Sequence, residues 1–390
     1  MTITAVVVLV CLVLIVSSDD YRAMTLDDSH DTLAYVTRDG RLSLYDPVTH
    51  TETLLLTDVE YFSLSPAGRV AYKSLSDNSL YVYDPSRPNH ESLRINPDVD
   101  VSFKPLAWSP DGQYLAFSSY EDREQINLFV WDGDTVSNIT PEDLLGTVRR
   151  FFVDWSYDGR LAFTIRYDRG NIPYEIYLWH GNDTVSLSQN PDESDSMASW
   201  YSTGWSNSGQ FMFLSQQDDI WQLYIWDGES VSNGSPDADT FTHILLNIEF
   251  NIMSFNPVWV DDFTVGISLG YPPDSEIVLW DTELNTVTER LPLAQASSWL
   301  DKDNEVIIYS GLASGLPSIF LDVTTLDGEI LFSDVVMNFL WSSRGYLAYC
   351  GFDEDRNTIL FVWDGQESRV VSQDYRISVQ WQSDPDQFGC

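Results

Sequence analysis

The sequence predicts an all-β fold, a β-propeller made of four-stranded antiparallel blades. Two motifs recur along the chain, one typified by LAWSPDGQYLAFSS and the other by NLFVWDG. Each repeating unit contains four short runs of β-branched and aromatic residues, separated by turn sequences and with almost no helical periodicity. A unit of roughly 40 to 50 residues with four strands is typical of a propeller blade.

The first motif carries a tryptophan at a fixed position. A large flat ring there suits the widening space between two sheets, so we expect these side chains to pack between blades rather than to bind a cofactor. Leu64 takes this position in an early unit. The expected packing residues are Trp108, Trp155, Trp205, Trp259, Trp299, Trp341 and Trp381.

The second motif predicts the number of blades. Its copies end at Tyr45, Tyr83, Trp131, Trp179, Trp226, Trp280, Leu321 and Trp363. Eight copies predict eight blades, and seven with a degenerate first unit is the alternative. Ser378 to Gln382 resembles a first strand with no blade after it, so we expect it to pair with the blade that begins near Leu33 and to close the ring. Met24 to Asp28 competes for that place.

The turn after the repeated tryptophan contains an acid that could be mistaken for a catalytic group. Pro110, Asp111 and Gly112 each suit a tight reversal of the chain. In the unit that contains Trp205, Ser208 occupies the turn position that Asp111 occupies in the unit of Trp108. A catalytic acid is not expected to recur in several blades and to accept serine in its place, so we interpret Asp111 as a turn residue.

The chain divides into an apolar leader, residues 1–18, and a single propeller domain, residues 19–390. The run from Ala5 to Val16 is shorter than the roughly 20 residues of a membrane span, which favours a signal peptide. No Lys or Arg precedes it, so an uncleaved anchor stays open as the alternative. Either reading predicts a location outside the cytoplasm. A Cys350–Cys390 disulfide would suit such a compartment, and a free, buried Cys350 is the alternative.

Charge and the reactive side chains exclude several functions. The formal net charge is −40, with 60 acids against 20 bases, which repels nucleic acid. The five histidines are far apart and no spacing resembles a zinc site, so we expect no cofactor and no metal. A calcium site assembled from several blades would leave no local motif and stays open. We expect a monomer.

Two longer phrases resemble a known repeat. WSPDGQYLAFSS and RYDRGNIPYEIYLWHG are similar to the propeller repeat of TolB and of the N-terminal domains of prolyl oligopeptidases, through Trp108 to Gly112 and Arg166 to Asn171. TolB-type propellers usually have six blades and a further N-terminal domain, whereas here the leader is followed almost directly by the repeats. The peptidases carry their catalytic serine on a separate α/β-hydrolase domain, and we find no such domain in this sequence. The resemblance therefore implies an interaction scaffold rather than a peptidase.

The lengths of the connections predict where a partner binds. With strands a to d in each blade, the a–b and c–d turns are short, and these define the short-turn ends of the blades. The b–c and d–a connections are longer and define the long-loop ends, where we expect binding of a protein, peptide or glycan. The alternative is a metal-assisted hydrolase or lactonase in the central channel.

The candidate binding residues are aromatic, acidic and arginine side chains of the b–c loops, together with residues of the two longest insertions, 188–203 and 235–255. Local Arg–carboxylate pairs that order each loop, and packing of the insertions onto the ring, are the alternative readings. The candidates are Tyr120, Asp122, Arg123, Tyr167, Asp168, Arg169, Trp200, Tyr201, His243, Phe352, Asp355 and Arg356.

Overall fold

The structure is a computed structural model of the chain. It describes residues 31–388 except for 88–90, 96–99, 122–124, 142–147, 168–174, 182, 189–194, 198–203, 218–219, 234–256, 260–261, 270–274, 285, 294–297, 302–305, 313–318, 326–329, 343, 353–357, 374 and 382–386. The leader and the segment from Met24 to Asp28 lie outside the described residues. Within the described part, no helix has the length and apolar character needed to cross a membrane.

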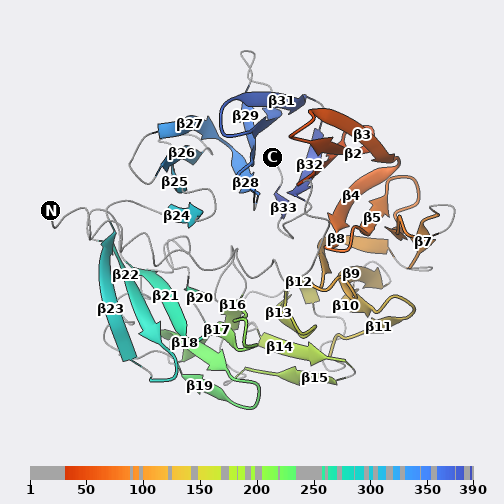
Figure 1. Cartoon of the computed structure of the whole chain (residues 1–390). Coiled ribbons are helices and arrows are strands. Elements are labelled where there is room, and N and C mark those ends of the chain that lie inside the picture. Colours follow the sequence, from red (N-terminus) through yellow and green to blue (C-terminus); the bar gives the residue numbers. More distant parts are fainter. Residues whose placement is uncertain are drawn as a thin grey trace. The chain divides into compact units, whose positions relative to one another are not determined.

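The described residues form eight antiparallel sheets (Figure 1). The first holds β33 (Gln387–Phe388), β32 (Tyr375–Trp381), β1 (Leu33–Thr37), β2 (Leu42–Asp46) and β3 (Thr51–Leu56). The second holds β4 (Val59–Leu64), β5 (Val70–Ser74), β6 (Leu80–Tyr83) and β7 (Leu93–Arg94). The third holds β8 (Asp100–Trp108), β9 (Leu115–Glu121), β10 (Gln125–Trp131) and β11 (Val136–Asn138).

The next three sheets follow the same plan. The fourth holds β12 (Val148–Trp155), β13 (Leu161–Tyr167), β14 (Glu175–His180) and β15 (Asp183–Ser186). The fifth holds β16 (Asp195–Met197), β17 (Phe211–Gln217), β18 (Ile220–Trp226) and β19 (Val231–Asn233). The sixth holds β20 (Val258–Trp259), β21 (Thr264–Leu269), β22 (Ser275–Asp281) and β23 (Thr286–Leu293).

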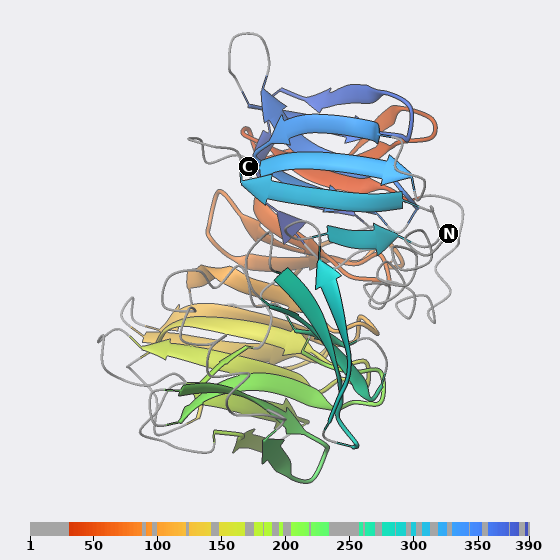
Figure 2. The ribbon, with the colours of Figure 1, turned by 90° about the vertical axis from the view of Figure 1, so that its left-hand side faces the viewer.

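The last two sheets complete the series. The seventh holds β24 (Ser298–Asp301), β25 (Val306–Leu312), β26 (Ile319–Thr325) and β27 (Ile330–Val336), which lie side by side in the lighter blues of Figure 2. The eighth holds β28 (Asn338–Trp341), β29 (Leu347–Phe352), β30 (Thr358–Trp363) and β31 (Ser368–Ser372). In seven sheets the neighbouring strands are consecutive in the chain, which is the topology of a propeller blade.

The chain forms two compact units. One comprises residues 1–21, 121–129 and 138–297, and its described part includes the fourth, fifth and sixth sheets. The other comprises residues 22–120, 130–137 and 298–390, and includes the first, second, seventh and eighth sheets. Each unit has its own buried apolar clusters, for example around Trp205 and Phe211 in one and around Val379 and Trp381 in the other.

The predicted pairing of the two ends of the chain is confirmed. Strand β1 pairs with β32 in an antiparallel ladder that sets Leu33 opposite Trp381 and Tyr35 opposite Val379. Strand β32 therefore supplies strand a of a sheet whose strands b, c and d come from the start of the described chain. A further short strand, β33, pairs with β32 and makes this sheet five-stranded.

Strands b and c of several sheets carry a stacked aromatic pair. The two rings lie on residues directly opposite in the ladder, where cross-strand neighbours contribute most to sheet stability. Ring centroids are 5.1 to 5.8 Å apart in these pairs. The pairs are Tyr72–Tyr81, Phe163–Tyr177, Phe213–Tyr224 and Tyr349–Phe361.

Candidate functional site

Three of the candidate binding residues fall on described strands, and all three lie at the end of a strand b. Tyr120 is the penultimate residue of β9 and is half-buried, and Phe352 is the last residue of β29, with 44% of its surface exposed. Tyr167 ends β13 opposite Val148, and its side chain lies outside the description. The other candidates lie outside the described residues: Asp122, Arg123, Asp168, Arg169, Trp200, Tyr201, His243, Asp355 and Arg356.

The repeated tryptophans are core residues where the structure describes them. Trp341 is half-buried, and the side chain of Trp299 lies outside the description, although its backbone belongs to β24. The buried members are Trp108, Trp155, Trp205, Trp259 and Trp381.

Four of these tryptophans also hold neighbouring sheets together through hydrogen bonds. In each case the indole Nε1–H donates to a backbone carbonyl of the preceding repeat unit. The carbonyl belongs to the residue just before the repeated tryptophan of that unit, or just before Leu64, which takes the place of the tryptophan in the second sheet. The donor and acceptor are 2.8 to 3.1 Å apart. The pairs are Trp108 with Ser63, Trp205 with Asp154, Trp259 with Gly204, and Trp381 with Leu340.

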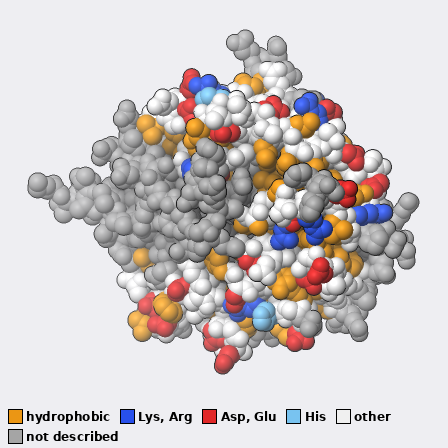
Figure 3. Space-filling view, turned by 45° about the vertical axis from the view of Figure 1, so that its right-hand side comes forward, with side chains coloured by type: hydrophobic (Ala, Val, Ile, Leu, Met, Phe, Trp, Pro, Cys, Tyr) orange, Lys and Arg blue, Asp and Glu red, His pale blue; other side chains and the backbone are white. Residues whose placement is uncertain are grey.

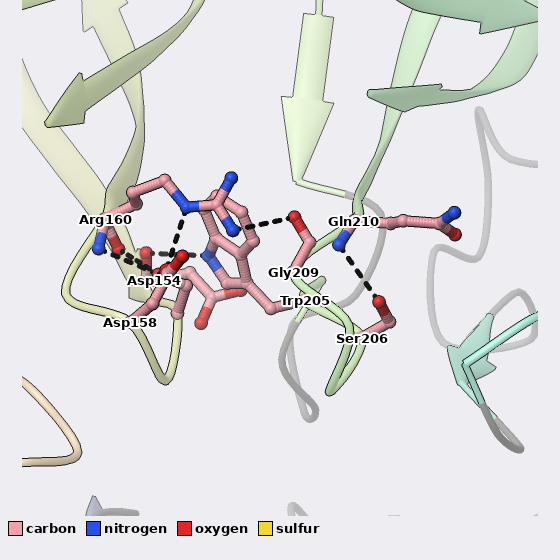
Figure 4. A network of polar contacts seen from close by, with 8 residues as sticks. Asp154, Asp158, Arg160, Trp205, Ser206, Gly209 and Gln210 are labelled. Carbon is pink, nitrogen blue, oxygen red and sulfur yellow. Dashed lines mark hydrogen bonds and ion pairs between the residues drawn. The ribbon is translucent and has the colours of Figure 1, made fainter. Parts of the chain in front are cut away.

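An arginine of the a–b turn strengthens one of these junctions. The guanidinium of Arg160 lies against the ring of Trp205 (Figure 4). It is 5.0 Å from the centroid of that ring and 5.0 Å from the centroid of the Trp226 ring, within cation–π range. It donates to the carbonyl of Gly209 at 3.0 Å and pairs with Asp158 at 2.8 Å. Burial opposes ionisation of Asp158, but hydrogen bonds from Arg160 and from a serine hydroxyl outweigh it and lower the pKa of this carboxyl.

Arg69 repeats this arrangement two sheets earlier. Its guanidinium lies 4.8 Å from the Trp108 ring and 5.8 Å from the Trp131 ring. Burial lowers the pKa of Arg69, partly offset by Asp84 and Asp111. An arginine just before strand b therefore covers a tryptophan pair of the next sheet at two junctions, a role that the sequence alone did not reveal.

Asp111 is a turn residue in the structure, as the sequence predicts. Its Oδ1 accepts hydrogen bonds from the Ser109 hydroxyl at 2.6 Å and from the Gln113 N–H at 2.9 Å. Gly112 has a φ of +66°, a left-handed conformation that L side chains rarely adopt. The carboxylate therefore helps to close the a–b turn. In the a–b turn of the fourth sheet, Asp158 plays the same role by accepting a hydrogen bond from the Ser156 hydroxyl.

The acids of the c–d turns serve the same purpose. In four of the described c–d turns the Asp Oδ1 accepts the backbone N–H groups two and three residues later, which is an Asx turn. Backbone hydrogen bonds lower the pKa of Asp132, chiefly from Thr135, and of Asp227, chiefly from Ser230. The aspartates that accept both N–H groups are Asp46, Asp132, Asp227 and Asp364.

The long-loop ends of the first two sheets form a closed polar network that the sequence did not indicate. Asp58, with a φ of +66°, accepts the hydroxyls of Ser74 at 2.6 Å and Ser76 at 2.7 Å through one carboxylate oxygen. Its own carbonyl accepts the N–H of Leu75 at 2.9 Å, and the carbonyl of Gly40 accepts the N–H of Val59 at 2.9 Å. These loops are ordered by their own contacts.

Neither a cluster of metal ligands nor, on the face seen in Figure 3, a concentrated patch of charge marks a site on the described residues. Among the described residues, no group of three or more His, Cys, Asp or Glu side chains is placed to hold a metal ion. Acidic side chains on the surface in Figure 3 are spread among polar and apolar ones rather than gathered in one patch. Cys350 is disulfide-bonded, and both other cysteines, Cys11 and Cys390, lie outside the described residues.

No family model and no curated protein matches the sequence. The chain is similar to the β-propeller domain of the trilobed protease from Pyrococcus furiosus, with 15% identity, a TM-score of 0.42, and coverage of 87% of this chain and 93% of that one. It is similar to the Pyrococcus horikoshii acylaminoacyl peptidase, with 14% identity, a TM-score of 0.42 and coverage of 85% of this chain but 47% of that one. For TolB from Acinetobacter baumannii the values are 15%, 0.33, 83% and 84%. The TolB and peptidase propellers that the repeat resembles are thus among the solved structures similar to this chain.

Proposed function

We propose that the chain is a non-enzymatic propeller of eight blades that binds a protein, peptide or glycan partner through the long-loop ends of its blades. The observation that carries this proposal is an exposed aromatic ring at the long-loop end of the eighth sheet. At the short-turn ends, the carboxylates of Asp111, Asp158 and Asp227 are bonded to their own turns. At the long-loop end of the eighth sheet, the ring of Phe352 stands exposed at the end of β29. Exposed aromatic side chains are frequent anchors of binding interfaces.

We further propose that this scaffold works outside the cytoplasm. The disulfide of Cys350 supports this location, because structural disulfides persist in oxidising compartments and are rare in the cytosol. The apolar run from Ala5 to Val16 is the second support, since it suits a signal peptide or an anchor. Microscopy of the tagged full chain together with fractionation of its native host tests the location, and a cytosolic pool of the whole protein would refute it.

The choice of binding end is tested with two phenylalanines that are matched in exposure. Phe352 is 44% exposed at the long-loop end of the eighth sheet, and Phe263 is 42% exposed in the a–b turn of the sixth. A partner is first captured on the tagged full chain and then purified, and glycans are surveyed on an array. The dissociation constant of the identified partner or glycan is then measured for wild type, Phe352→Ala and Phe263→Ala.

We expect Phe352→Ala to weaken binding by about tenfold or more, the usual effect of removing an aromatic anchor. Phe263→Ala should leave the dissociation constant within about twofold of wild type. The opposite pattern would place the partner at the short-turn ends and refute the proposal. Equal, unchanged affinities for both variants would exclude Phe352 from the interface and refute it as well.

A further inference from the structure

Cys350 lies inside the junction where the two ends of the chain meet. It belongs to β29, is fully buried, and packs in one apolar cluster with Leu33, Tyr35, Val379 and Trp381. Leu33 and Tyr35 come from β1, and Val379 and Trp381 come from β32. The disulfide of Cys350 therefore starts beside the ladder that pairs the ends of the chain.

The strands around Cys350 point to its partner. Strand β33 pairs with β32 through Phe388 and Val379 and also lies against β28. Strand β28 in turn pairs with β29, with Asn338 opposite Cys350. Cys390 is two residues after Phe388, and two residues span at most about 7 Å. Cys11, the other cysteine, is 20 residues before the first described residue.

We propose that Cys350 and Cys390 form a disulfide latch that fastens the C-terminal segment across the junction where β32 closes on β1. The β1–β32 ladder consists of hydrogen bonds that can open locally, as terminal strands do. A covalent bond from β29 to Cys390, two residues after β33, keeps β32 beside β1 while the ladder is open, so the ladder can close again in the same register. The latch thus acts on the closing strand rather than on the other blades.

The burial of Cys350 predicts that this disulfide forms during folding and resists reduction afterwards. An external dithiol opens it by attacking the Cys390 sulfur, which breaks the S–S bond and expels the Cys350 thiolate. A second thiolate of the reagent then releases Cys390, so that two electrons and two protons pass to the protein and the dithiol becomes a cyclic disulfide. Cys350 is fully buried among apolar side chains, where a thiolate is unfavourable and leaves slowly. Reduction of the folded protein should therefore be slow and should accelerate in denaturant.

The pairing itself is tested by mass spectrometry of the non-reduced full chain after proteolysis with thiols blocked. We expect a linked peptide pair that contains Cys350 and Cys390 and that disappears after reduction. A Cys11→Ser variant should retain this pair, and a Cys390→Ser variant should show free Cys350. A link between Cys350 and Cys11, a link between two chains, or free Cys350 in the wild type would overturn the proposal.

The effect on closure is tested by hydrogen exchange of the same proteins. Reduction of the wild type, or Cys390→Ser without reduction, should speed amide exchange in β32 and β1 by at least about tenfold, since a cross-link removes freedom from the opened segment. Strands β13 and β14 of the other unit serve as the internal control and should be unchanged. Equal acceleration in all four strands would mean that the bond stabilises the chain globally, and no acceleration in any would mean that it does not secure the closure. Both outcomes would overturn the latch.

Discussion

Two neighbouring tryptophans of the sixth sheet allow the indole hydrogen bond to be measured in isolation. Trp259 donates its Nε1–H to the carbonyl of Gly204 at 2.8 Å and is 6% exposed. Trp280, in β22 of the same sheet, is 1% exposed, and among the described residues its Nε1 has no hydrogen-bond partner. Replacement of either ring by phenylalanine removes a similar apolar surface and volume, so the two variants differ mainly in the hydrogen bond.

The difference in stability can be worked out from these contacts. Trp259→Phe loses one intersheet hydrogen bond, worth about 1 kcal/mol net. The Gly204 carbonyl keeps its second donor, the N–H of Met212 at 2.8 Å, so it is not left unpaired. Trp280→Phe loses no hydrogen bond to any described residue and removes a buried donor whose desolvation costs about 1 kcal/mol or more. We therefore expect Trp259→Phe to be less stable than Trp280→Phe by about 2 kcal/mol.

Equilibrium unfolding in urea measures this difference. At a slope of about 3 kcal/mol/M, the midpoint of Trp259→Phe should lie about 0.7 M below that of Trp280→Phe. Equal midpoints, or a lower midpoint for Trp280→Phe, would refute the claim that the indole N–H groups join the sheets.

Three further predictions use the same unfolding assay. Arg160→Met, which keeps the apolar stem but loses the bonds of the guanidinium, should cost about 2 kcal/mol, whereas Arg369→Met, an exposed ion-pair residue, should cost less than about 0.5 kcal/mol. Asp227 has a lowered pKa, so it contributes stability above about pH 4 that is lost as pH falls through its folded pKa. Asp227→Asn should consequently lose less stability than wild type between pH 5 and pH 3 (about two units around the normal Asp pKa). Gln380→Leu strips the buried N–H and C=O of Leu64 of a side-chain partner and should cost about 3 kcal/mol, and a loss below about 1 kcal/mol would contradict this reasoning.

The sequence predicted the parts of this structure that are local or that repeat. The position of Trp205 and the turn role of Asp111 follow from recurrence and from residue chemistry within about ten residues. The sequence did not predict that Arg160 covers Trp205 and Trp226, because that contact depends on how the next sheet packs on its predecessor. The network around Asp58 was missed because it joins this residue to serines that lie 16 and 18 positions later in the chain, and because it rests on an αL backbone at an aspartate.

The long-loop ends illustrate a second limit of prediction. Phe352 was a candidate because its motif recurs, and the structure does place it exposed at the end of β29. Tyr120 arises from the same pattern but is half-buried beside the β8–β9 ladder. The motif therefore fixes the strand end on which an aromatic residue lies, whereas exposure depends on the neighbouring loop, which differs from blade to blade.

The closing junction is joined by a different hydrogen bond at Leu64, the residue that stands in the position of the repeated tryptophan. Other sheets are built from continuous chain, but the first joins strands about 350 residues apart, and closing so long a loop costs about 5 kcal/mol of chain entropy. A tryptophan at position 64 would add one indole bond to the preceding sheet. Instead, Gln380 of β32 makes two buried bonds to the Leu64 backbone, at 2.8 Å to its N–H and at 3.3 Å to its carbonyl. Both bonds fall on β32, the strand that closes the first sheet, so they strengthen the junction at which the entropy cost of closure arises.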